Sequence, residues 1–204
     1  MRSIFGVVLG AFLLWLFYIL SPLGALLSLA DGVRARDVAT IERRVDMRRL
    51  RTSLARQVGA AYMRSTGAQK EQSATSQFGA AAAAAIVDPL LAPFLTPDAL
   101  MQMMSTGRLP GAPGELGTET GRGIVEDLDF ARAVSLESAR DLFFASEWRG
   151  FTTFLIALPM GRPLPERFRL EMRLSGFTWT VTGLELPVAV RDRIVQQIIA
   201  RNNS

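Results

Sequence analysis

The stretch IFGVVLGAFLLWLFYILSPLGALLSLADG, residues 4–32, contains no charged side chain before Asp31. Its first part, residues 4–20, is an uninterrupted run of apolar side chains and glycines. As a helix that rises ~1.5 Å per residue, this run is ~26 Å long, close to the ~30 Å hydrocarbon core of a bilayer. The run therefore predicts a helix that can cross a membrane.

Three interpretations of this run compete: a retained anchor, a cleaved export signal, and a core helix of a soluble domain. A signal would start at Arg2 and be cut after the small-x-small sequence Ser28-Leu29-Ala30. The apolar run is longer than the roughly 7–15 residues of a signal, and the cut would lie well beyond its end. A charge-free run at the extreme terminus is also unusual in a soluble core. We therefore expect a single-pass anchor that spans residues 4–20.

The pair Ser21-Pro22 has the chemistry of a helix start, because a hydroxyl cap is followed by proline at the first helical position. Apolar residues at helical spacing follow from Leu23 to Val33, so a new helix is expected there. Cleavage after Ala30 would cut this helix in two. The charges that flank the run do not decide its orientation.

The composition excludes much of catalytic chemistry. The chain has no histidine and no cysteine, and Lys70 is the one lysine among 23 basic residues. Imidazole bases, thiolate nucleophiles, disulfides and Cys/His zinc sites are therefore ruled out. We expect no catalytic residue, no cofactor, no metal and no enzymatic activity.

The chain has room for one anchor and one compact domain. Asp37, Asp46 and Thr96-Pro97 are expected to start helices, and the alanine run 80–85 also favours helix. We divide the chain into an anchor, a helical part, a flexible Gly/Pro-rich loop, and a β-meander with a terminal helix that completes the same domain: residues 1–21, 22–104, 105–123 and 124–204.

The last third of the chain changes to the period of strands. Residues 151–158, 168–174 and 177–186 predict an antiparallel meander, with Phe177, Trp179 and Val181 on one buried face. The preceding segment, 128–147, either adds a strand or is helical. A terminal amphipathic helix is expected after Pro187. Helices followed by strands give an α+β fold.

SPLGALLSLADGVRARDVATIERRVDMRRLRTSL (21–54), FLTPDAL (94–100) and FTWTVTGLELP (177–187), in this order, resemble the bacterial family catalogued as domain of unknown function twenty-nine thirty-nine. Met47 stands where that family has an aromatic residue. The resemblance covers residues 1–187 except the glycine-rich loop. It implies an inner-membrane anchor with the domain outside the cytoplasm, and it brings no known catalytic residue. The order of elements is also similar to the cone-shaped nuclear-transport-factor-2-like fold, in which helices and a curved sheet enclose a cavity.

Three functions are compatible with these features. The first is an anchored binding module for an envelope protein or small apolar ligand, with a pocket lined by Phe154, Phe168 and Trp179. The second is a carboxylate enzyme with a small cavity. The third is a domain that docks on anionic lipid; nucleic acid is not expected. The carboxylate candidates are Glu126, Asp127, Asp129 and Asp141, and the lipid-facing candidates are Arg48, Arg49, Arg51 and Arg56.

Overall fold

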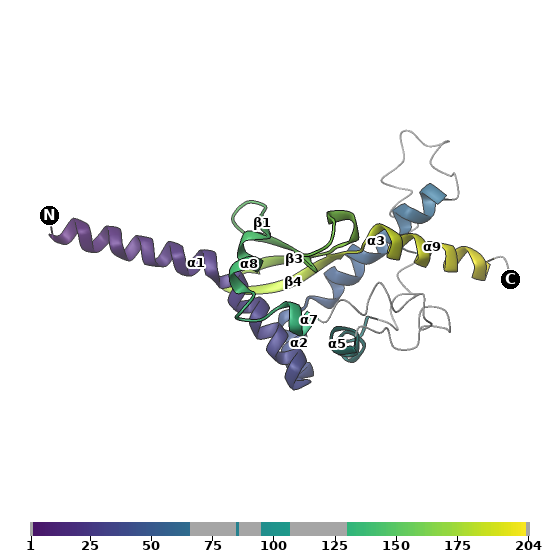
Figure 1. Cartoon of the computed structure of the whole chain (residues 1–204), viewed down its shortest axis with the longest axis horizontal. Coiled ribbons are helices and arrows are strands. Elements are labelled where there is room, and N and C mark those ends of the chain that lie inside the picture. The colour runs from purple at the N-terminus through teal and green to yellow at the C-terminus, as the bar shows by residue number, and fades with distance from the viewer. Residues whose placement is uncertain (1, 66–84, 86–94, 107–129, 203–204) are drawn as a thin grey trace.

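The computed structural model describes residues 2–65, 85, 95–106 and 130–202. Its fold is α+β, as predicted, with helices that pack on an antiparallel sheet (Figure 1). The elements in chain order are α1 (Arg2–Ala35), α2 (Val38–Arg44), α3 (Met47–Ser65), α5 (Pro97–Thr106), α7 (Phe130–Ala133), α8 (Ala139–Phe144), β1 (Ser146–Trp148), β2 (Thr153–Leu158), the 3-10 turn η2 (Leu164–Glu166), β3 (Phe168–Ser175), β4 (Thr178–Glu185) and α9 (Val188–Asn202).

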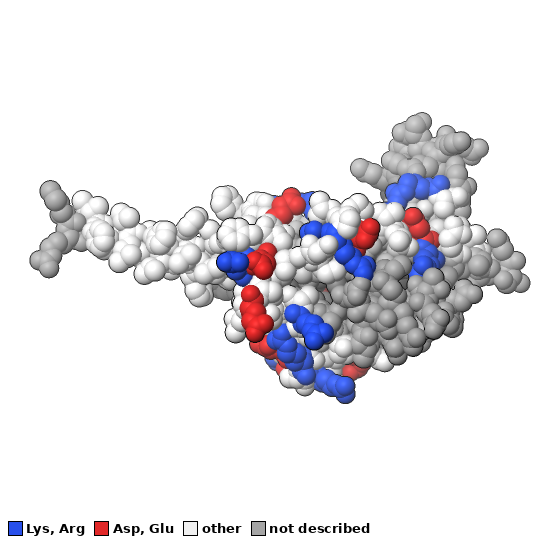
Figure 2. Space-filling view, in the orientation of Figure 1, with Lys and Arg blue, Asp and Glu red and all other residues white. Residues whose placement is uncertain are grey.

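Helix α1 has two halves in different surroundings. Its first half projects away from the body (Figure 1), and Figure 2 shows no charged side chain on its residues 4–20. Phe5 is 71% exposed and Phe17 is 75% exposed. Its second half packs beneath the sheet, where Leu26 and Leu29 are completely buried. Among the described residues, α1 is the one helix long and apolar enough to cross a membrane.

Ser21-Pro22 does not start a new helix, so that prediction was wrong. Helix α1 continues through Pro22. Proline has no N–H to donate to the carbonyl of Tyr18, four residues earlier. The hydroxyl of Ser21 donates to that carbonyl instead, at 2.7 Å. The hydroxyl also accepts a hydrogen bond from Trp179 Nε1 at 2.8 Å, so strand β4 helps to hold the helix at its proline.

The next two helices start where the acidic residues predict. Asp46 caps α3, because its carboxylate accepts a hydrogen bond from the backbone N–H of Arg49 at 3.0 Å. Asp37 precedes α2, but its carboxylate accepts from the hydroxyl of Thr40 and makes no side-chain cap to the backbone. Helix α2 ends at Arg44, and Val45 is already extended. The predicted apolar face of α3 is buried at Leu50, Leu54, Val58 and Ala61, with Met47 half-buried.

The sheet has four strands in the order β1-β2-β3-β4, one more than the three of the simplest prediction. Residues 139–148 are both helix and strand: α8 ends at Phe144 and β1 follows. One face of the sheet packs on α1, α2, α5, α7 and α8 and forms the main core. Its buried side chains include Phe154, Ile156, Leu170, Met172, Trp179 and Val181.

The segment 177–186 departs from the predicted alternation at two places. Trp179 and Val181 are buried as expected, but Phe177 is fully exposed because it lies in the turn before β4. Gly176, in the same turn, has a φ of 61°, which glycine tolerates without strain. After Val181 the pairing with β3 shifts, so that Thr182 is an extra residue and is buried as well.

The outer edge of β4 is covered by the helical part of the chain. Val45 forms a bridge with Val181, and the N–H of Asp46 donates to the carbonyl of Val181 at 2.8 Å. Further along, the side-chain amide of Gln57 donates to Leu184 O at 2.7 Å and accepts from Leu186 N at 3.1 Å. These bonds satisfy backbone groups that an edge strand would otherwise leave free.

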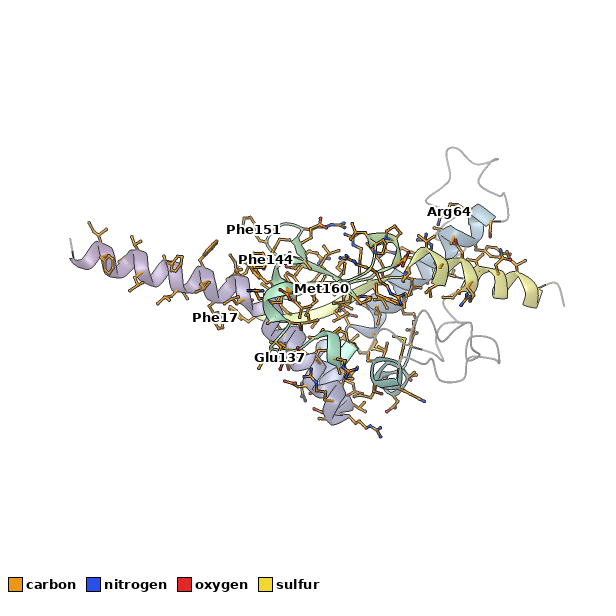
Figure 3. All side chains as sticks on the ribbon, viewed as in Figure 1. Phe17, Arg64, Glu137, Phe144, Phe151 and Met160 are labelled. Atoms are coloured by element: carbon orange, nitrogen blue, oxygen red, sulfur yellow. The ribbon has the colours of Figure 1, made fainter. Side chains whose placement is uncertain are left out.

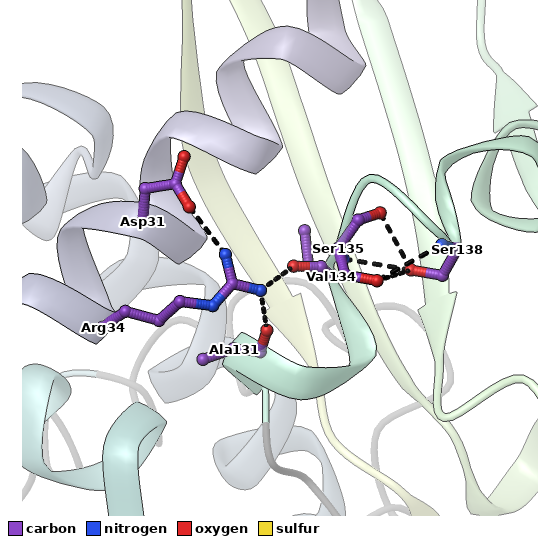
Figure 4. Close-up of polar contacts among 6 residues, drawn as sticks. All are labelled: Asp31, Arg34, Ala131, Val134, Ser135 and Ser138. Atoms are coloured by element: carbon purple, nitrogen blue, oxygen red, sulfur yellow. Dashed lines mark hydrogen bonds and ion pairs between the residues drawn. The ribbon is translucent and has the colours of Figure 1, made fainter.

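Arg34 ties the segment around α7 to α1 (Figure 4). Its guanidinium donates to Asp31 at 2.6 Å, to the carbonyl of Val134 at 2.8 Å, and to the carbonyl of Ala131. These carbonyls lie at the end of α7, where a cation is favourably placed. Elsewhere, α9 packs against α3 in a second, smaller core of Ala55, Val58, Ala61 and Val195.

The start of α5 is confirmed, because Ala99 N donates to Thr96 Oγ1 at 3.1 Å. Most of the alanine run 80–85, most of the Gly/Pro-rich loop 105–123, and the carboxylates Glu126, Asp127 and Asp129 lie outside the described residues.

Candidate functional site

The aromatic residues predicted to line a pocket are mainly core. Phe154 is completely buried and Trp179 is 2% exposed. Their rings lie 6.4 Å apart, and both contact Trp148, whose ring also packs on Tyr18 of α1 at 5.6 Å. This aromatic cluster joins the sheet to α1 and leaves no room for a ligand between its rings.

Phe168 does line a cavity, but a small one. The cavity has a volume of about 50 Å³ and lies between the sheet and helices α5 and α7. Sites for small ligands usually measure about 300–1,000 Å³. The pocket that we expected between sheet and helices is therefore too small for such a ligand. The other described residues around it are Val45, Leu50, Leu100, Met103, Met104, Phe130, Leu158, Leu170, Val181 and Leu184.

A larger groove, of about 690 Å³, lies on the opposite face of the sheet. Its floor is an apolar strip of Leu155 and Ala157 on β2. Helix α3 forms one wall with Ser53, Arg56 and Gln57, and it comes close to the floor where β4 has Gly183. A Cβ at Gly183 would lie 3.2 Å from Ser53 Oγ. The rest of the wall comes from the η2 turn and the start of α9, with Leu164, Pro165, Arg167, Val188 and Arg191.

Charged side chains cross the floor of this groove in a connected pattern. Arg169 on β3 donates to Glu185 on β4 at 3.0 Å and to Glu147 on β1 at 3.1 Å. It can reach Glu147 because the intervening strand has the small Ala157 opposite Arg169. Glu171 accepts a hydrogen bond from the hydroxyl of Thr182 at 3.4 Å.

The remaining cations of the groove are not matched by carboxylates among the described residues. Arg167 donates to the carbonyl of Arg162. Arg191 has a buried Nε with no hydrogen-bond partner in the described part of the chain. Arg56 is exposed on α3. An anionic group that enters the groove would therefore meet arginines whose charge is available.

The carboxylate hypothesis gains nothing from the described residues. Asp141 lies on α8 at the surface, with its side chain 61% exposed beside Arg140 at 3.5 Å. In the groove, Arg169 binds both Glu147 and Glu185, and Glu171 accepts a hydrogen bond from the hydroxyl of Thr182. Among the described residues, no cluster of acidic side chains could hold a metal ion.

The four arginines proposed to face lipid do not share one environment. Arg48 and Arg49 are exposed near the start of α3, and Arg49 pairs with Asp46 at 3.3 Å. Arg51 is half-buried, and Arg56 lines the groove. Helix α3 runs away from the projecting half of α1, and Arg64 at its far end lies on the opposite side of the body from that half (Figure 3).

The groove residues of the sheet were not singled out from the sequence. A signal was present, because Arg169, Glu171 and Arg173 alternate with the apolar residues of β3 and must share its second face. That alternation predicts a charged face. It cannot show that α3, η2 and α9 surround the face and make a groove of it.

Residues 11–103 match the sequence model of a family described as a protein of unknown function, DUF2939. The predicted resemblance is confirmed. The match includes most of α1, all of α2 and α3, and the first part of α5, but it ends before the sheet, whereas we expected the resemblance to reach residue 187. No curated protein and no solved structure matches the chain. The similarity to the nuclear-transport-factor-2-like fold therefore stays a prediction.

Proposed function

We propose that the chain is a single-pass membrane-anchored binding module, not an enzyme, and that its groove binds an amphipathic molecule with an anionic group. The observation that carries this proposal is the groove of about 690 Å³ with an apolar floor and arginines around it. Its volume falls in the usual range for small-ligand sites. The exposed apolar side chains of Leu164 and Val188 in its wall suit a hydrocarbon chain, and Arg56 and Arg191 suit a carboxylate or phosphate.

The two environments of α1 support a retained anchor. Its first half exposes large apolar side chains along its whole length, as expected of a helix surrounded by lipid. Cleavage after Ala30 would remove Leu26 and Leu29, which are completely buried, and also Ser21, which binds Trp179. A domain cut at that point would lose part of its own core, whereas a cleaved signal is dispensable to the fold that follows it.

The resemblance to the family supports a place in a bacterial inner membrane, with the body in the periplasm. The charges near the apolar run do not decide the orientation, because Arg2 lies on one side and Arg34 and Arg36 on the other. A reporter that is active only outside the cytoplasm, fused to the C-terminus, tests this orientation. An active reporter agrees with the proposal, and an inactive one places the body in the cytoplasm.

Ligand binding is tested with three probes that share an eight-carbon chain: octanoate, octanol and octylammonium. The full chain is placed in phosphatidylcholine nanodiscs, and its thermal unfolding temperature is measured against probe concentration. A ligand that binds only the folded state raises this temperature. Octanoate should raise it most and octylammonium least, because among the described residues of the groove the arginines without a carboxylate partner outnumber Glu171, the carboxylate without an arginine partner.

A matched pair of variants locates the binding site. Arg56→Gln removes a cation of the groove, and Arg48→Gln removes an exposed arginine of the same helix outside the groove. Only Arg56→Gln should reduce the effect of octanoate. Equal responses to octanoate and octanol, or equal responses of the two variants, would contradict an anionic ligand in this groove.

A further inference from the structure

Three exposed phenylalanines lie close to the point where α1 leaves the body. Phe144 is 77% exposed at the end of α8, Phe151 is 84% exposed in the β1–β2 loop, and Phe177 is fully exposed in the β3–β4 turn. We call these three side chains the aromatic rim. Figure 3 places Phe144 and Phe151 on the side of the body from which the first half of α1 projects.

Contacts between α1 and the sheet fix this position. Trp148, three residues before Phe151, packs on Tyr18. Trp179, two residues after Phe177, donates to Ser21. The two loops also lie side by side, because Leu174 N donates to Thr152 O at 2.8 Å. Both loops of the rim therefore flank the last turn of the apolar run.

The geometry also sets the level of the rim along α1. Strand β4 runs away from the projecting half of α1 (Figure 1), so the β3–β4 turn, which precedes β4, lies at the end of the strand nearer that half. Two strand residues span ~7 Å, which is a little more than one turn of helix. Because Trp179 is bound to Ser21, the β3–β4 turn lies near the end of the apolar run.

We propose that the aromatic rim inserts into the lipid surface around α1 and fixes the body at one orientation on the membrane. This inference rests on the proposed anchor. The apolar run of ~26 Å is shorter than a hydrocarbon core of ~30 Å, so lipid reaches up to the level of Tyr18 and the rim. Phenylalanine is among the side chains that interfacial segments bury at this depth, where hydrocarbon meets the headgroups.

Basic side chains flank the rim on the body side. Arg149 lies in the same loop as Phe151 and is half exposed, with an ion pair to Glu147 at 3.5 Å. Arg173 is exposed on β3 just before the β3–β4 turn. Aromatic residues with arginines beside them are typical of segments that lie in the interface of a membrane.

The absence of native cysteine makes a direct test simple. Single cysteines at Thr152 and Ser175, both exposed next to rim residues, carry a nitroxide spin label in the full chain in phosphatidylcholine vesicles. The accessibility of each label to oxygen, which concentrates in lipid, is compared with that to a water-soluble nickel complex. Phe17→Cys reports on the anchor itself. Glu166→Cys, an exposed position on η2 at the other end of the sheet and outside the residues that line the groove, is the control.

We expect a several-fold higher oxygen-to-nickel ratio at residues 152 and 175 than at 166, and a loss of this difference when Phe151 and Phe177 are changed to serine. A lipid-like ratio at 17 with water-like ratios at 152 and 175 overturns the inference and keeps the anchor. A water-like ratio at 17 as well overturns the anchor. Dipolar broadening between labels at 152 or 175, without oxygen accessibility, means that a second copy covers the rim, which also overturns the inference.

Discussion

At the scale of single residues, Ser21 explains how a proline fits inside α1. Pro22 removes one backbone donor, and the hydroxyl of Ser21 both replaces that donor at Tyr18 O and accepts from Trp179. A serine one residue before a proline thus links a kink-prone point of the helix to strand β4.

Ser21→Ala should lower the free energy of unfolding by about 1–3 kcal/mol, because it leaves both the carbonyl of Tyr18 and Nε1 of Trp179 without a partner. Ser21→Thr keeps the hydroxyl and is the control. Urea unfolding of the purified full chain, followed by tryptophan fluorescence, measures the difference. Equal stability of the alanine variant and the parent would show that the two hydrogen bonds of the Ser21 hydroxyl contribute nothing to the free energy of unfolding.

Asp37 gives the chain a predictable response to acid. The hydroxyl of Thr40 donates to its carboxylate and lowers the pKa of Asp37 below the ordinary 3.8, and the Arg43 guanidinium acts in the same direction. The folded state therefore favours the ionised form. This stabilisation is complete above the unfolded pKa and is lost as the pH falls through the lower, folded pKa.

Thr40→Val should consequently be less stable than the parent at neutral pH, and the difference should shrink as the pH falls below about 3.8. Unfolding midpoints measured in urea from pH 7 to pH 2.5 test this. In an Asp37→Asn background the effect of Thr40→Val should not depend on pH. A pH-independent difference in the parent background would mean that the Asp37–Thr40 bond does not carry the effect.

Residue-level patterns were reliable where the interaction is local. Asp46 and Thr96 cap helices as predicted, because a cap needs only its own next three residues. Ser21-Pro22 has the same local signature but lies within a helix, since the helix is held there by the distant Trp179. A sequence pattern that extends over a few residues cannot include such a partner.

At the scale of elements, the crossing of α1 and α2 depends on the absence of a side chain at Gly32. A Cβ there would lie 2.5 Å from Cγ2 of Thr40 and 2.8 Å from its Cβ. The two helices are joined by a connection of only two residues, in which Arg36 has a φ of 54°. They have little freedom to move apart.

Gly32→Ala should lower the free energy of unfolding by about 1–3 kcal/mol through overpacking at this crossing. Gly24→Ala is the matched control in the same helix, where a new Cβ meets nothing within 4 Å. The control should be neutral or up to about 1 kcal/mol more stable, because alanine is the better helix former. Thermal or urea unfolding of both variants measures these effects. Equal effects of the two variants would contradict the close packing of Gly32 against Thr40.

The strands show what periodicity can and cannot predict. Phe168, Leu170 and Met172 alternate in the sequence and are buried together, as predicted. Phe177 continues the same alternation in the sequence but is exposed in a turn, and Thr182 is buried because of the shift in pairing. The residue at which a turn ends and the residue at which a bulge lies both depend on the partner strand. The sequence pattern of one strand contains no information about that partner.

At the scale of the whole molecule, α1 belongs to two environments. Its first half is apolar and exposed, and its second half provides Leu26, Leu29 and Val33 to the main core. The sequence predicts both halves by their composition. It does not predict that one continuous helix joins them, so that the sheet and the proposed anchor are held in a fixed relation at Tyr18 and Ser21.

Two truncations separate these halves. Removal of residues 2–16 should leave a folded, soluble body, because the side chains removed are mostly exposed. Removal of residues 1–30 should prevent folding, since each large buried side chain lost costs about 2–5 kcal/mol against a typical stability of about 5–15 kcal/mol. Circular dichroism and cooperative thermal unfolding distinguish the two. A folded product of the longer truncation would show that the buried half of α1 is not needed by the domain.

The most direct test of a retained anchor is the intact mass of the mature protein after expression in a bacterium that exports it. The membrane fraction is washed with alkaline carbonate, and the chain is purified from it for mass spectrometry. A protein of the full 22.3 kDa that resists the wash is the predicted result. A soluble product that begins near Asp31 would contradict the account, because the first half of α1 would then be an export signal and the aromatic rim would have no anchor beside it.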